Sequence, residues 1–114
     1  STQPAAYILM LVDTSVAGKV DTDAGAAAMS VRLAAQAEGI ASCWLGNVDR
    51  AQLMAPLKID AERFAPHPVI ALGSPAMAAR AVEMQDGSTA YYMEDRDTLC
   101  VPKRQQKDIV SWYG

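Results

Sequence analysis

Cysteine and histidine are scarce in this chain of 114 residues, which contains two cysteines, Cys43 and Cys100, and one histidine, His67. Two cysteines so far apart do not form a disulfide framework, and they favour a reduced, cytoplasmic setting. Together with one distant histidine they also lack the spacing of a metal site. The neighbours of Cys43 provide neither a cation nor a base, so we predict a buried structural cysteine there rather than a Cys–His nucleophile. The residues thus indicate no catalytic side chain and no metal site.

Positive charge and long apolar runs are also in short supply. The 10 lysines and arginines are outnumbered by 13 aspartates and glutamates, and the formal net charge of −3 argues against a nucleic-acid-binding protein. No apolar run approaches the roughly 18–20 residues of a membrane helix, and the N-terminal residues lack the basic segment of a signal peptide. The phosphate-binding motifs G-x-G-x-x-G and G-x-x-x-x-G-K-[ST] are missing as well. We therefore expect neither a nucleic acid nor a membrane as partner.

What the sequence does contain is an alternation of short apolar stretches with helix-forming ones. Hydrophobic residues make up 51% of the chain but aromatic residues only 6%, so we expect a mostly aliphatic and alanine core. Short apolar runs bounded by Pro, Gly or Asp predict three buried strands, at residues 5–12, 41–45 and 67–75. After a polar loop at residues 13–19, an alanine-rich helix begins at residues 21–23 and ends before Gly39.

The alanine-rich helix has very few polar residues. Past its first turn only Arg32, Gln36 and Glu38 are clearly polar. A helix this apolar is buried on most sides. We therefore expect it to pack against its own sheet and also against a partner subunit.

The remaining part of the chain is more polar. The elements that we expect there are a short helix at 50–57 capped by Asp49, a mixed polar stretch at 76–97, a short extended piece at 98–101, and a terminal helix or arm at 103–113. No internal repeat or linker divides the sequence, so we predict a single domain over residues 1–114. Strands that alternate with helices indicate the α/β or α+β class.

One basic cluster, VPKRQQK at 101–107, contains Lys103 and Arg104. A Lys–Arg pair is suited to hold a phosphate, because arginine offers a planar fork of donors and lysine a compact charge. A solvated surface is the more common role of such a cluster near a C-terminus, so both interpretations stay open on the residues alone.

Four segments, taken in order, resemble the FMN-dependent nitroreductase family. DAGAAAMSVRLAAQAEGIASCWLG, residues 23–46, resembles the central helix, strand and turn of that family. AAYILMLVD before it and HPVIALGSP after it resemble two further strands of the family. YYMEDRDTLCVPKRQQKDIVSWY, residues 91–113, resembles the C-terminus of a bacterial branch. Together these segments extend along nearly the whole chain.

The resemblance implies both a fold and a chemistry. The fold is an α+β sandwich, with a mixed sheet flanked by helices, in an intertwined homodimer that has its two FMN sites at the dimer interface. The chemistry is electron transfer from NAD(P)H through FMN to a small-molecule acceptor such as a nitroaromatic or a quinone. In such an enzyme the cofactor performs the reaction, and the protein positions and tunes it.

The resemblance also implies which residues bind the cofactor. Main-chain N–H groups near the N5 and O4 edge of the flavin ring would come from Cys43, Trp44, Leu45 and Gly46. Gly46 would let the backbone and the ring approach closely. Lys103 and Arg104 match the C-terminal basic pair that holds the FMN phosphate.

One motif of the family has no counterpart in this chain. In the family, an R-R-S-x-R segment of the N-terminal helix binds the FMN phosphate, whereas this chain has no arginine before Arg32. We therefore expect a domain truncated at its N-terminus. It is either part of an FMN-dependent NAD(P)H oxidoreductase or a shortened, non-catalytic module for dimerisation or ligand binding. A thiol enzyme that uses Cys43 is a third alternative.

Overall fold

The computed structural model describes residues 3–16 and 20–114, except for the side chain of Val20. The loop predicted at residues 13–19 therefore lies partly outside the described residues. The chain divides into two units, residues 1–75 and 76–114, and each unit is described by itself.

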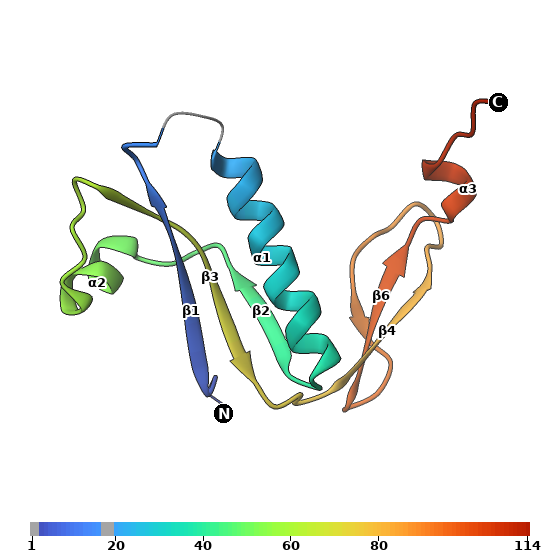
Figure 1. Ribbon diagram of the computed structural model, residues 1–114. Helices are drawn as coiled ribbons and strands as arrows, with labels where there is room; N and C mark the ends of the chain where they lie inside the picture. The colour runs from blue at the N-terminus through green and yellow to red at the C-terminus, as the bar shows by residue number, and fades with distance from the viewer. Residues whose placement is uncertain (1–2, 17–19) are drawn as a thin grey trace. The chain divides into compact units, whose positions relative to one another are not determined.

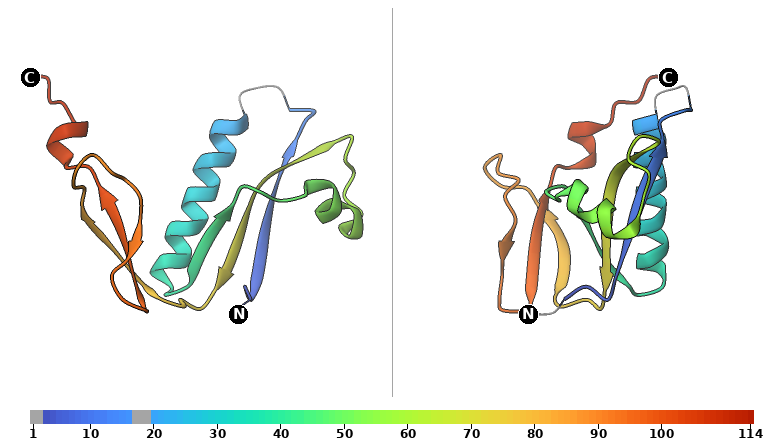
Figure 2. Two further views of the ribbon diagram at one scale, coloured as in Figure 1. Left: turned by 180° about the vertical axis from the view of Figure 1, so that it is seen from behind. Right: turned by 90° about the vertical axis from the view of Figure 1, so that its left-hand side faces the viewer.

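The first unit is a three-stranded antiparallel sheet, and the long helix α1 lies on one face of it (Figures 1 and 2). Its elements are β1 (Ala6–Asp13), α1 (Val20–Ala37), β2 (Ala41–Leu45), α2 (Arg50–Met54), the 3₁₀ helix η1 (Ala55–Leu57) and β3 (Phe64–Gly73). The strand order is β1-β3-β2, so β3 is central. As expected from the sequence, Asp49 caps α2, and its carboxylate accepts a hydrogen bond from the Gln52 N–H at 3.1 Å.

Helix α1 contacts the sheet through a stripe of small side chains. Ala28 is fully buried and Ala35 is 8% exposed, while Ala24 and Val31, on the same side of the helix, are half-buried. The spacing of these residues is that of one helical face. Because most of them are alanines, the helix can approach the central strand closely. Ile70 of β3 is fully buried in this layer.

A glycine ends α1 and turns the chain into β2. Gly39 has a φ of 72°, in the left-handed region. The Ile40 N–H donates to the Ala35 carbonyl at 2.8 Å, and the Gly39 N–H donates to the Gln36 carbonyl at 3.1 Å. This pair of bonds is the Schellman motif, which satisfies the last carbonyls of a helix. The predicted stop at Gly39 is therefore confirmed.

The central strand contains a β-bulge next to two prolines. Leu9 pairs with Val69, but Leu11 pairs with Pro66, so two residues of β3, His67 and Pro68, lie opposite one residue of β1. Prolines cannot donate to the ladder and are tolerated at such irregularities. The bulge directs His67 toward α1, where its Nε2 lies 3.4 Å from Asp21 Oδ1. On the N-terminal side of the bulge β3 continues to pair with β1, so the strand begins at Phe64 and not at the predicted residue 67.

Two strands predicted to be buried are edge strands in the sheet of the described residues. β1 and β2 each pair only with β3, and large side chains on both are exposed: Tyr7 is 57% and Trp44 is 41% exposed. Cys43 is exposed as well, so the prediction of a buried structural cysteine there is wrong. Short apolar runs do not by themselves distinguish central strands from edge strands. Whether a strand has a partner on one side or on both depends on how many strands the sheet contains and in which order.

The second unit is a small mixed sheet. β4 (Ala78–Glu83) pairs in parallel with β6 (Thr98–Lys103), and β5 (Tyr92–Met93) pairs antiparallel with the other edge of β6. Only residues 106–109 of the predicted terminal helix are helical, as α3 (Gln106–Ile109). The sequence does not predict β4, because its residues, AARAVE, are mostly small or charged and carry no strong strand signal.

Helices and sheets together confirm the α+β class. The prediction of one domain over residues 1–114 stays a prediction. Among the residues described, no helix combines the length and the apolar character needed to cross a bilayer.

The two glycines of the α1 region predict opposite effects of the same substitution. Gly39→Ala is expected to lower the free energy of unfolding by about 1–2 kcal/mol, because an added Cβ is strained at positive φ. Gly25→Ala, inside α1, is expected to raise it by up to about 1 kcal/mol, because alanine favours the helix. Neither new Cβ meets a described atom outside its own chain neighbours within 4 Å, so the backbone conformation decides the sign of each effect. Urea unfolding followed by circular dichroism measures both, and equal effects at the two sites would contradict a left-handed backbone at Gly39.

Candidate functional site

The turn that follows β2 is open to solvent. β2 ends at Leu45, and the exposed Gly46 comes next. Gly46 does not have a positive φ, and no described atom lies within 4 Å of a Cβ placed on it. Neither backbone strain nor a close neighbour in the described chain therefore requires glycine here. The open space beside Gly46 suits the approach of a planar ligand to the main chain.

Side chains of β2 alternate between the two faces of the sheet. Ser42 lies on the α1 side, since the Arg32 Nε–H donates to Ser42 Oγ at 3.3 Å. Cys43 points to the opposite face, in one cross-strand row with Ala71 and Tyr7. The Cys43 Sγ has only a long contact of 3.9 Å to the Trp44 carbonyl oxygen. The hydrogen bonds of the described residues thus provide no base for this thiol.

The two basic residues predicted to bind phosphate lie in the second unit. Lys103 is the last residue of β6, in register with Glu83 of β4, and Arg104 follows it. Both side chains are exposed. The Glu83 carboxylate is contacted by the Gln105 amide. The sequence therefore identifies two candidate groups, the turn in the first unit and the basic pair in the second.

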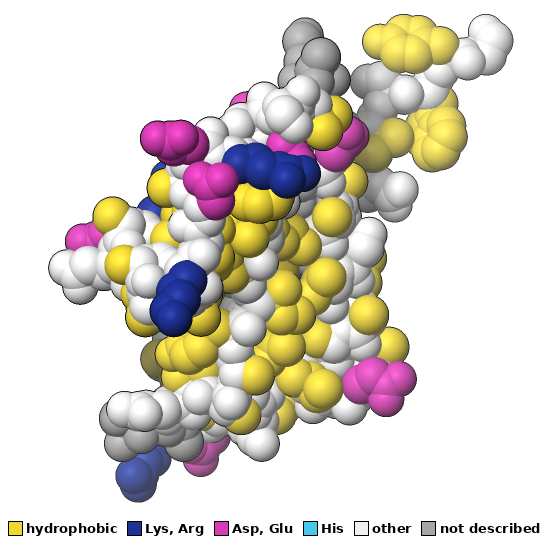
Figure 3. All heavy atoms as spheres, turned by 60° about the vertical axis from the view of Figure 1, so that its left-hand side comes forward, with side chains coloured by type: hydrophobic (Ala, Val, Ile, Leu, Met, Phe, Trp, Pro, Cys, Tyr) yellow, Lys and Arg dark blue, Asp and Glu magenta, His cyan; other side chains and the backbone are white. Residues whose placement is uncertain are grey.

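A cavity between β1 and α1 was not predicted from the sequence. Its volume is about 390 Å³. It is lined by Met10, Leu11, Val12, Asp13, Val16, Asp23, Ala24 and Ala27. Hydrophobic side chains cover a broad area of the face shown in Figure 3, and charged side chains lie mostly toward its margins. The only sequence signal for this cavity is the scarcity of polar residues in α1.

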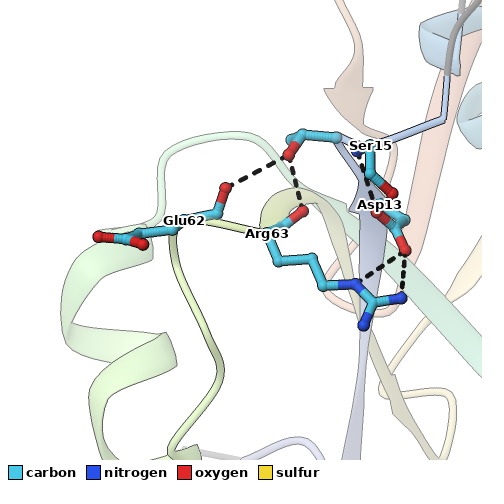
Figure 4. A network of polar contacts seen from close by, with 5 residues as sticks. Asp13, Ser15, Glu62 and Arg63 are labelled. Atoms are coloured by element: carbon cyan, nitrogen blue, oxygen red, sulfur yellow. Dashed lines mark hydrogen bonds and ion pairs between the residues drawn. The ribbon is translucent and has the colours of Figure 1, made fainter.

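At the end of β1, Asp13 ties two distant segments together (Figure 4). Its Oδ2 accepts hydrogen bonds from Arg63 Nε at 3.0 Å and Nη2 at 2.8 Å, and its Oδ1 accepts one from the Ser15 hydroxyl at 2.6 Å. Thr14 adds two bonds of 2.8 Å to the Arg63 carbonyl, from its N–H and its hydroxyl. Hydrogen bonds from Arg63 and then from Ser15 lower the pKa of Asp13 from 3.8 to about 2. This network anchors the start of β3 to the end of β1.

In the second unit a row of side chains crosses three strands. Arg80 of β4 and Tyr92 of β5 flank Cys100 of β6, and Arg80 forms an ion pair with Glu94. The pKa of Arg80 is raised, first by its contact with Cys100 and then by the charge of Glu94. Cys100 is fully buried, so this thiol is part of the core of the unit and is not accessible to a substrate. Within the described ranges, no group of three His, Cys, Asp or Glu side chains is arranged to hold a metal ion.

Comparison with known proteins identifies one family. The model of the nitroreductase family matches residues 13–74, from the last residue of β1 to just beyond β3. The match includes residues 43–46, the end of β2 and the turn that follows it. No curated protein matches the chain.

The Asp13–Arg63 pair predicts a pH dependence of stability. Asp13 binds its proton more weakly in the folded chain, with a pKa of about 2, than in the unfolded chain, where the value is 3.8. The stabilisation by its carboxylate is therefore complete above about pH 4, and it is lost as the pH falls toward 2. In unfolding measurements between pH 7 and 2, the difference in the free energy of unfolding between wild type and Asp13→Asn is expected to be largest above about pH 4 and to shrink as the pH falls toward 2.

Glu62→Gln is the matched control, because it removes a neighbouring exposed carboxylate that has no hydrogen bond or ion pair among the described residues. It is expected to leave the pH profile unchanged. A difference between wild type and Asp13→Asn that stays constant from pH 2 to 7 would contradict the role of the ionised pair.

Proposed function

The chain belongs to the nitroreductase family, and we propose on that basis that it forms part of an FMN-dependent oxidoreductase that uses NAD(P)H. At the level of the family, this is an oxidoreductase of the flavin type. The exposed turn after β2 is the observation that carries the proposal for this chain. We further propose that both units act as one nitroreductase-like domain, in a homodimer.

The residues of the turn fit an FMN ring. Gly46 leaves open space on its Cα, and no side chain of the described residues fills it. Cys43, Trp44 and Leu45 pair with β3, so alternate N–H groups of this part of β2 point to that strand. The N–H groups of residues 43–46 that point away from β3 would donate toward the N5 and O4 edge of the ring. When bound, FMN would supply the hydride and electron chemistry, and these donors would favour negative charge on the ring without a reactive side chain. An exposed Cys43 is compatible with this role, because only its backbone is used.

Lys103 and Arg104 would hold the phosphate of FMN. They are adjacent and exposed at the end of β6, so a phosphate could meet a point charge and a planar fork of donors together. The electron acceptor would be a small molecule such as a nitroaromatic or a quinone.

The outer face of α1 supports the proposal of a homodimer. Leu33 is 60% and Met29 is 47% exposed, on the side opposite to the buried alanines. Apolar side chains that remain exposed along a helix favour contact with another protein surface. The same face is also compatible with the alternative function, a non-catalytic module for dimerisation or ligand binding. A measurement of FMN-dependent activity therefore has to distinguish the oxidoreductase from this module.

The proposed phosphate site can be tested by substitution. In FMN titrations of the protein, Lys103→Ala with Arg104→Ala is expected to weaken FMN binding by about 10- to 100-fold, because two charge-assisted contacts are lost. Riboflavin, which lacks the phosphate, is expected to bind both forms alike. Flavin fluorescence quenching measures both ligands.

Arg96→Ala is the control for this experiment, since Arg96 is an exposed arginine of the same unit outside the basic pair. It is expected to bind FMN like the wild type. If FMN binds the wild type and the double variant equally, the phosphate role is wrong. If the wild type neither binds FMN nor oxidises NAD(P)H, the non-catalytic module is the better interpretation.

The proposed dimer contact can be tested in the same way. Leu33→Arg places a charge on the outer face of α1 and is expected to shift the protein from dimer to monomer, as measured by light scattering after size-exclusion chromatography. Gln52→Arg, which adds the same charge on the exposed surface of α2, is expected to leave the dimer intact. A dimer that survives Leu33→Arg would show that this face is not the subunit contact.

A further inference from the structure

Arg32 is the only basic residue of α1, and it reaches across to β2. Its Nε–H donates to Ser42 Oγ at 3.3 Å, and the contact is partly buried. The described ion pairs join Arg63 to Asp13 and Arg80 to Glu94, with a longer contact of His67 to Asp21. In that part of the chain Arg32 thus has a hydroxyl partner and no carboxylate partner.

The position of Ser42 gives this hydrogen bond its significance. β2 is an edge strand of five residues, and its ladder connects it only to β3. The Schellman motif at Gly39 holds the start of β2 against the end of α1. The bond from Arg32 holds the second residue of β2, Ser42, three residues before the strand ends at Leu45. The chain is therefore joined to the helix at these two points, and beyond Ser42 the strand is held only by its pairing with β3 among the described residues.

We propose that Arg32 acts, through its hydrogen bond to Ser42, as a positioning residue for the segment 43–46, which is the end of β2 and the residue after it. Without this bond, the end of the edge strand would depend on the β3 ladder alone, and its main-chain donors would be less well ordered. The link to flavin rests on the proposed function, whereas the ordering of the strand does not.

The positive charge of Arg32 has a second consequence for the same site. The guanidinium lies beside the strand that leads into the turn, and no carboxylate among the described residues pairs with it. A cation near a flavin favours the reduced, more negative form of the ring. Ordering requires the hydrogen bond, whereas the effect on the flavin potential requires the charge, so different variants separate them.

Hydrogen exchange of the β2 amides, measured by mass spectrometry on the chain without flavin, tests the ordering. Arg32→Met and Ser42→Ala are each expected to accelerate exchange of these amides by about three- to tenfold, as expected for one lost hydrogen bond. The double variant is expected to be no faster than either single variant, because both remove the same bond.

Two matched controls accompany these variants. Ser30→Ala removes a hydroxyl of the same helix that bonds only to the Ala26 carbonyl, and Arg50→Met removes an exposed arginine of α2. Neither is expected to change exchange in β2. Unchanged exchange in both Arg32→Met and Ser42→Ala would overturn the proposal, as would a double variant whose effect is the sum of the two.

FMN titration and the flavin midpoint potential of the same proteins separate this proposal from the proposed function. Both variants are expected to bind FMN about three- to tenfold more weakly, but only Arg32→Met is expected to lower the potential, and Arg32→Lys is expected to restore it. If the wild type binds no FMN while exchange still accelerates in the variants, the positioning role holds and the proposed function fails. If FMN binds all variants equally with unchanged exchange, the positioning role fails and the proposed function stands.

Discussion

The first unit depends on the antiparallel ladder of β3, which among the described residues is the one strand of its sheet with a partner on each side. β1 and β2 do not contact each other in the ladder, so each is held in register only through β3. The fully buried Ile70 lies in this strand, and α1 packs its alanines over it. The position of the candidate turn after β2 therefore follows from pairs such as Leu45 with Val69.

Local signals in the sequence predict most of this unit. Gly39 needs a left-handed backbone, and Asp49 offers a side-chain acceptor to a helix start, so both boundaries are marked by single residues. The predicted bounds of β2 are correct for the same reason, since Gly39 and Gly46 enclose a short apolar run. Exposure could not be predicted, because whether Cys43 is covered depends on which segments lie over its face of the sheet. The bulge at His67 and the bond between Asp13 and Arg63 join residues far apart in the chain, and no local pattern indicates them.

In the candidate site, too, some features could be predicted from the sequence and others could not. The turn and the basic pair are predicted through resemblance, and the family match over residues 13–74 includes only the turn. The role of Ser42 could not be predicted, because a serine in an edge strand has no special signal until a donor is seen opposite it. In the sequence, Arg32 is simply a polar residue on an apolar helix. The structure shows that its side chain lies on the side of β2, where it donates to Ser42 Oγ.

The connection between α1 and β2 contains only three residues, 38–40, and main-chain hydrogen bonds hold all three to the helix. Such a link has almost no slack. A displacement of α1 along the sheet would therefore move the first residue of β2 with it. A contact that shifted the helix would in this way also shift the start of β2.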